Sequence, residues 1–84
     1  MRAIDYLAQK EVECAQVYLT VEEATYIVEK LNGLLADPEA CDHFHVDDDT
    51  RDLSFSIVTP LKLAGRRYTP LETQVLAGMC DPPA

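Results

Sequence analysis

The stretch that decides the fold is "TVEEATYIVEKLNGLLADP", residues 20–38, which has the pattern of a capped amphipathic helix. Thr20 and Glu23 form a T-x-x-E capping box, in which each side chain can satisfy a free backbone N–H of the other. The helix is expected to end at about Ala36, because a residue that precedes proline avoids helical geometry. Behind the cap, one apolar face recurs at helical spacing: Ala24, Ile27, Val28, Leu31, Leu34 and Leu35.

Two short segments after this helix alternate with a period of two residues, which predicts a β-hairpin. They are "DHFHV", residues 42–46, and "LSFSIV", residues 53–58. The polar residues 47–52 between them are expected to form the turn. The apolar face of the hairpin can pack on the helix, and its polar face would carry four side chains together: His43, His45, Ser54 and Ser56.

The segments before the helix predict additional strands. "CAQVYLT", residues 14–20, alternates apolar and polar side chains in the manner of a half-buried strand. "AIDYLA", residues 3–8, suits either a short helix or a strand that pairs with residues 12–19. We favour the strand, because a two-layer domain needs a sheet wide enough to cover the helix.

After Pro60, "LKLAGRRYT" (residues 61–69) is expected to be a loop or a short edge strand that bends at Ala64-Gly65. Thr69, Pro70 and Glu72 then predict a second, short helix with a capping box and proline at its first position. The tail "DPPA", residues 81–84, is expected to fray. The predicted fold is therefore a two-layer α+β domain over residues 1–84, with a small antiparallel sheet, one main helix and a short C-terminal helix.

Composition narrows the classes of function. The net charge of −8 disfavours nucleic acid and anionic membranes as partners. The chain has no run of about 18 apolar residues, so no membrane-spanning segment is expected. Its start lacks the pattern of a secretory signal, and its three cysteines are widely spaced, which favours a cytoplasmic location.

The segment "CDHFHVDDD", residues 41–49, is the most conspicuous candidate site. Cys41, His43 and His45 would form a row on one strand, about 6.5–7 Å apart, and could supply metal ligands. A lone H-x-H without a second ligand cluster is a weak signal for zinc, so we predict no metal and no other cofactor. The run after Val46 departs from the EF-hand calcium pattern, because Arg51 and Asp52 stand where a ligand and a glycine are required.

Catalysis is not expected from this sequence. Ser54 and Ser56 fall inside a strand and not on an exposed turn, and the chain has too few glycines for a phosphate-binding loop. Two other sets of residues are candidates for contact surface, although the arginines of the second set would alternatively offset the acidic half of the same chain. The two sets are the histidine and aspartate row, His43, His45, Asp47, Asp48 and Asp49, and the basic-aromatic patch, Arg66, Arg67 and Tyr68.

Charge is unevenly distributed along the chain. Residues 11–52 contain twelve Asp and Glu against Lys30 and Arg51, a net charge of −10. Residues 53–79 contain Lys62, Arg66 and Arg67 against Glu72, a net charge of +2. An acidic surface of this kind aids solubility, and it also speeds association with a basic protein.

The segment Thr20 to Val58, with its helix, its "HFHV" strand and a second strand, resembles small immunity proteins of bacterial polymorphic toxin systems. The resemblance covers about half of the chain and brings no catalytic residues. It implies a cytoplasmic protein that binds a toxin, here a basic domain such as a nuclease. The alternatives are a phage-type inhibitor of a host nuclease, a small metal-binding domain using Cys41, His43 and His45, and a homodimerisation module.

Overall fold

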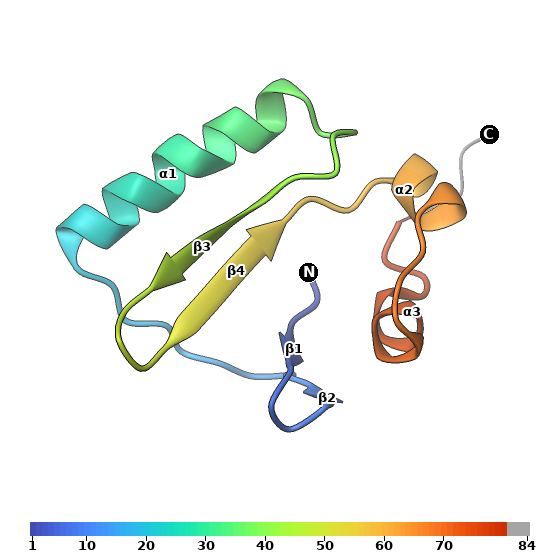
Figure 1. Ribbon diagram of the computed structural model, residues 1–84, viewed down its shortest axis with the longest axis horizontal. Coiled ribbons are helices and arrows are strands. Elements are labelled where there is room, and N and C mark those ends of the chain that lie inside the picture. Colours follow the sequence, from blue (N-terminus) through green and yellow to red (C-terminus); the bar gives the residue numbers. More distant parts are fainter. Residues whose placement is uncertain (81–84) are drawn as a thin grey trace. The chain divides into compact units, whose positions relative to one another are not determined.

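The computed structural model describes residues 1–80, which form two compact units. The first unit combines the chain ends, Met1–Val17 and the chain from Pro60 onward, and the second is continuous, Tyr18–Thr59. Two antiparallel sheets of two strands each, one main helix and two short helices make a small α+β fold, as predicted (Figure 1). The single domain expected for residues 1–84 stays a prediction.

Helix α1, Val21–Ala36, begins and ends as the sequence predicts. The Thr20 hydroxyl accepts from the Glu23 N–H at 3.1 Å, and the Thr20 N–H donates to the Glu23 carboxylate at 3.0 Å. Asp37 is the C-cap, and its N–H donates to the Leu34 carbonyl. Local capping therefore sets both ends of the helix.

Strands β3, His43–Asp47, and β4, Asp52–Ser56, form the expected antiparallel hairpin. Phe44 lies opposite Phe55, and their rings stack with centroids 5.1 Å apart. The Tyr26 ring of α1 meets the Phe44 ring edge-on at 6.2 Å. These aromatic contacts join the helix layer to the hairpin layer.

The hairpin does not cover the whole apolar face of α1. Leu34 is buried, whereas Val28 is 60% exposed and Leu35 is 63% exposed. The apolar face predicted for the helix is therefore only partly buried, and Val28 and Leu35 lie on its exposed side. Two strands are too narrow to cover a stripe of this width, so one side of the stripe faces solvent.

The N-terminal segment of the first unit is a short ribbon. Strand β1, Ile4–Asp5, pairs with β2, Lys10–Glu11, so the preference for a strand holds for two residues. The prediction that this strand pairs with residues 12–19 is wrong, because its partner is Lys10–Glu11. The Asp5 carboxylate accepts from the N–H groups of Leu7 and Ala8, both at 3.0 Å, which turns the chain back earlier.

The strand expected at residues 14–20 is also wrong. These residues form neither helix nor strand, and all of them are exposed. A period of two residues produces a strand only where another strand supplies hydrogen bonds, and no strand in the described part of the chain pairs with this segment.

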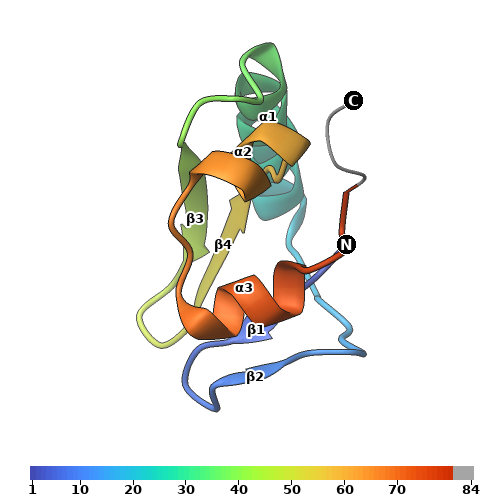
Figure 2. The same ribbon diagram turned by 90° about the vertical axis from the view of Figure 1, so that its right-hand side faces the viewer.

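The C-terminal segment of the first unit contains two short helices (Figure 2). Helix α2, Pro60–Gly65, replaces the loop or edge strand expected there. Proline suits the first turn of a helix because its fixed φ is already helical and its missing N–H is not needed. Helix α3, Pro70–Leu76, has the predicted Thr69–Glu72 capping box. The expectation of a frayed tail lies outside the described residues.

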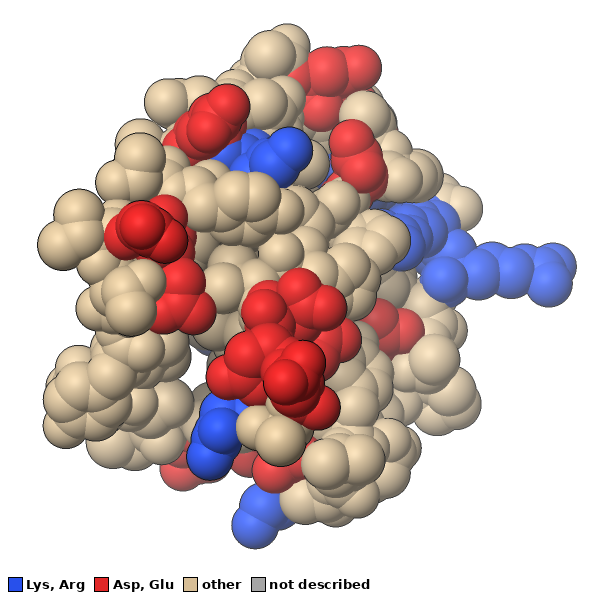
Figure 3. Space-filling model, turned by 60° about the vertical axis from the view of Figure 1, so that its left-hand side comes forward, with Lys and Arg blue, Asp and Glu red and all other residues tan. Residues whose placement is uncertain are grey.

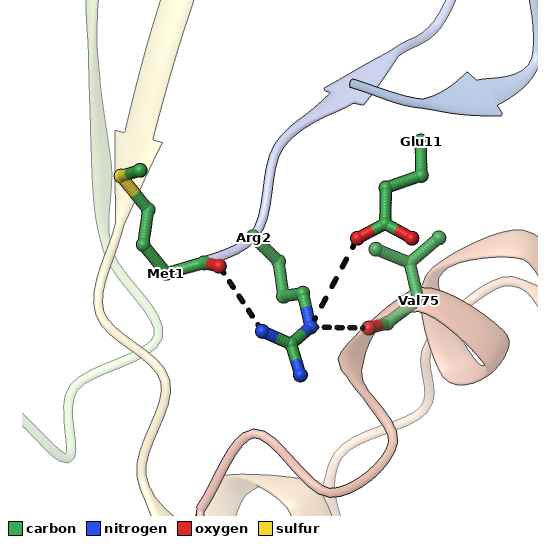
Figure 4. Close-up of polar contacts among 4 residues, drawn as sticks. All are labelled: Met1, Arg2, Glu11 and Val75. Atoms are coloured by element: carbon green, nitrogen blue, oxygen red, sulfur yellow. Dashed lines mark hydrogen bonds and ion pairs between the residues drawn. The ribbon is translucent and has the colours of Figure 1, made fainter. Parts of the chain in front are cut away.

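Polar contacts join the two chain ends within the first unit. The Arg2 Nε donates to the Val75 carbonyl of α3 at 3.2 Å and lies 4.0 Å from the Glu11 carboxylate (Figure 4). The Tyr6 hydroxyl donates to the Glu72 carboxylate at 3.0 Å. The N-terminal ribbon is thus fastened to α3 by side chains about 70 residues apart in sequence.

Candidate functional site

The polar face of the β3–β4 hairpin carries the four side chains predicted to lie together. Cross-strand pairing puts His43 opposite Ser56 and His45 opposite Ser54. The two imidazole rings contact edge-on with centroids 4.9 Å apart. The His45 Nδ1 lies 2.8 Å from the Asp52 carboxylate, and both side chains remain substantially exposed.

The alternative of a metal-binding domain requires a set of ligands that lie close together. Within residues 1–80, no three His, Cys, Asp or Glu side chains are grouped so that they could hold an ion. Cys41 is exposed and precedes the strand, and the Asp52 carboxylate is hydrogen-bonded to His45. In this arrangement His43 contacts His45, and the Asp52 carboxylate adjoins His45.

The three consecutive aspartates have different surroundings. Asp47 is the last residue of β3. The Asp48 carboxylate accepts from the N–H groups of Thr50 and Arg51 at 2.8 and 2.7 Å, and these bonds hold its pKa below the ordinary value. Asp49 is exposed in the turn. Asp48 therefore shapes the hairpin turn, whereas Asp47 ends the strand and Asp49 is exposed.

An acidic groove lies between α1 and β3. A concavity of ≈ 690 Å³ is lined from the helix by Tyr26, Glu29 and Lys30, and from the strand by His43, His45 and Asp47. An adjoining concavity of ≈ 420 Å³ shares Tyr26, His45 and Asp47 and adds Glu22 and Glu23. We call these two concavities together the α1–β3 groove.

The electrostatic character of the groove is negative. Five carboxylates line it, namely Glu22, Glu23, Glu29, Asp42 and Asp47, against a single lysine, Lys30. Asp and Glu also gather near the centre of the face displayed in Figure 3. The groove therefore favours cationic groups.

Tyr26 and Lys30 are among the groove residues that were not predicted as site residues, together with Glu22, Glu23, Glu29 and Asp42. Tyr26 is 39% exposed, and the Lys30 ammonium lies 5.5 Å from the centroid of its ring. The available signal was their spacing: Tyr26, Lys30 and Gly33 recur at i, i+4 and i+7, so they form a second row beside the apolar stripe.

The basic-aromatic patch belongs to the other unit. The Arg66 guanidinium lies 5.2 Å from the centroid of the Tyr68 ring. Tyr68 is half-buried, and its buried hydroxyl has no hydrogen-bond partner among residues 1–80. Arg67 is exposed. The structure therefore brings Arg66 and Tyr68 of this patch together.

The described residues include no helix with the length and apolar character needed to cross a membrane. Comparison of the chain with protein-family models, with curated proteins and with solved structures gives no match.

Proposed function

We propose that this chain is a non-catalytic protein-binding module whose α1–β3 groove receives a basic segment of another protein. The observation that carries this proposal is the convergence of five carboxylates and one accessible tyrosine on a single groove. Acidic side chains steer a basic partner toward the groove, and an aromatic side chain at its centre supplies contact area.

The histidine row extends the same surface. His43, His45 and Asp47 alternate along β3 and also line the groove. Imidazole and carboxylate groups can accept hydrogen bonds from guanidinium and ammonium donors. A basic segment lying along β3 would meet this row on one side and Glu29 of α1 on the other.

The resemblance of residues 20–58 to bacterial immunity proteins makes a toxin domain, such as a nuclease, the expected partner. An inhibitor of a host nuclease has the same physical requirements, so this alternative remains a proposal of the same kind. Co-expression with the toxic product of the neighbouring open reading frame tests the immunity function. Relief of growth arrest together with a co-purified complex is the expected result, and continued toxicity without a complex contradicts it.

The part played by the groove is tested with charge-neutral variants of that complex. The double variant Glu29→Gln/Asp47→Asn should slow association about tenfold at low salt, with a smaller effect at high salt. Glu13→Lys is the matched control, because it changes the net charge by the same amount as the double variant, at an exposed position of the other unit. Equal association rates for the groove variant and the control would reject the groove as the binding surface.

A homodimer is the second candidate, and the exposed side of α1 favours it. Val21, Val28 and Leu35 are 84%, 60% and 63% exposed and recur at intervals of seven residues. In an antiparallel pair of α1 helices centred on Val28, Val21 of one copy would meet Leu35 of the other. Mass measurement in solution tests this pairing: Val28→Asp should abolish a dimer, and a monomeric unmodified chain would exclude it.

A further inference from the structure

The ammonium group of Lys30 lies over the Tyr26 ring, and both residues line the groove. This ammonium lies 5.5 Å from the Tyr26 ring centroid, within the distance at which a cation is attracted to an aromatic face. The Phe44 ring also meets the Tyr26 ring, at an interplanar angle of 77°. A cation from the same chain therefore already lies over the Tyr26 ring, although Tyr26 stays 39% exposed.

The surroundings of Lys30 suit a second, external cation. Glu29 and Asp47 line the concavity that Lys30 lines, and Glu22 and Glu23 line the adjoining one, which Tyr26 also lines. Within the described residues, Lys30 forms no ion pair with any of these carboxylates. Its ammonium is therefore held mainly by the aromatic ring, a contact weak enough at an exposed site to be exchanged.

We infer that the α1–β3 groove contains an arginine or lysine site centred on Tyr26, for which Lys30 competes from within the chain. This inference rests on the proposed function and specifies the side chain of the basic partner that would bind in the groove. An incoming guanidinium would stack on Tyr26 and pair with Glu22 or Asp47, while Lys30 moves into solvent. Arginine suits the site better than lysine, because its planar group stacks on aromatic rings and donates in a fork to carboxylates.

The test measures binding of a fluorescently labelled nona-arginine peptide to the full chain. Removing the competitor with Lys30→Gln should tighten binding by about three- to fivefold beyond the effect of charge alone. Lys10→Gln is the matched control, since it makes the same change in net charge on the exposed strand β2 of the other unit. The Tyr26 ring resonances should shift on addition of peptide to the unmodified chain.

The outcomes separate the inference from the proposed function. If Lys30→Gln and Lys10→Gln tighten binding equally, or if the Tyr26 resonances do not move while peptide binds, the arginine site is wrong and a diffuse acidic surface remains. If the peptide does not bind even at low salt, the proposed recognition of a basic partner fails as well. A greater gain for Lys30→Gln, retained in Lys30→Gln/Tyr26→Phe and lost in Lys30→Gln/Tyr26→Leu, supports the aromatic site.

Discussion

The two compact units are stabilised in different ways. The unit Tyr18–Thr59 is continuous in sequence, and apolar contact between α1 and the hairpin forms its centre, with Leu34 and Phe44 buried. The other unit joins the two ends of the chain, and its helices and strands are short. There, side-chain hydrogen bonds from Arg2 and Tyr6 supplement Val75, which is the buried apolar residue among those that the structure describes in this unit.

The candidate groove therefore belongs to the unit with the larger buried apolar centre, Tyr18–Thr59. The groove needs α1 and β3 to stay at a fixed separation. The edge-on contact between Tyr26 of α1 and Phe44 of β3 joins these two elements, and stacking on Phe55 holds the Phe44 ring within the hairpin. The Thr59 hydroxyl also donates to the Glu39 carboxylate at 2.8 Å, which fastens the chain after β4 to the turn after α1. Four predictions test the comparison, from the largest expected effect to the smallest.

Loss of the Phe44 ring should cause the largest effect. Phe44→Ala removes contacts to both Tyr26 and Phe55 and is expected to lower the free energy of unfolding by about 3–5 kcal/mol. Urea unfolding followed by far-ultraviolet circular dichroism measures the change. Val28→Ala is the control, because its side chain is largely exposed and its loss should cost less than about 0.5 kcal/mol. Similar losses for the two variants would contradict a core centred on Phe44.

Removal of a polar contact in the other unit should lower the free energy of unfolding by less. Arg2→Ala removes the bond to the Val75 carbonyl and should cost about 1 kcal/mol, since the contact is only partly buried. Hydrogen exchange should then quicken at the Val12 N–H, which donates to the Ala3 carbonyl. Lys10→Ala serves as the control for loss of a basic side chain in the ribbon. Unchanged exchange in Arg2→Ala would mean that the ribbon does not depend on this contact.

The two capping boxes allow a symmetrical experiment. Thr20→Ala and Thr69→Ala each remove one N-cap and should each cost about 1 kcal/mol. If the units open separately, hydrogen exchange should increase within α1 for the first variant and within α3 for the second. An equal increase in both helices for either variant would show that the two units unfold together. That result would contradict the view that each unit is stabilised separately.

The smallest expected effect is a loss of stability at acid pH. Hydrogen bonds, first from the Thr69 N–H and then from the Thr69 and Tyr6 hydroxyls, hold the Glu72 pKa below its ordinary value of 4.5. Because the pKa is lower in the folded state, this stabilisation is present above pH 4.5 and is lost as the pH falls through the folded-state pKa. Tyr6→Phe should raise the Glu72 pKa toward 4.5, as measured by carboxyl chemical shifts. An unchanged value would exclude a contribution from Tyr6.

The continuous unit was largely predictable from the sequence. The Thr20–Glu23 box, the Asp37-Pro38 stop and the alternation around Phe44 are local patterns, and each has the expected structure. The capping-box pattern also predicted α3 correctly, whereas alternation failed at residues 14–20, for which the described residues supply no partner strand. The charge imbalance and the row of His43 and His45 were also evident, whereas Asp48 gave no sign that its carboxylate serves the turn.

The sequence by itself determined the capped helices, the hairpin with its polar and apolar faces, and the acidic character of residues 11–52. Those features follow from interactions between residues close together in the chain, within one turn of helix or across one short loop. Only the tertiary structure decided that Arg2 meets Val75, that Val28 and Leu35 stay exposed, and that Tyr26 and Lys30 border a groove. Such contacts depend on how distant segments pack and on how wide a sheet each helix finds, and no local pattern specifies either.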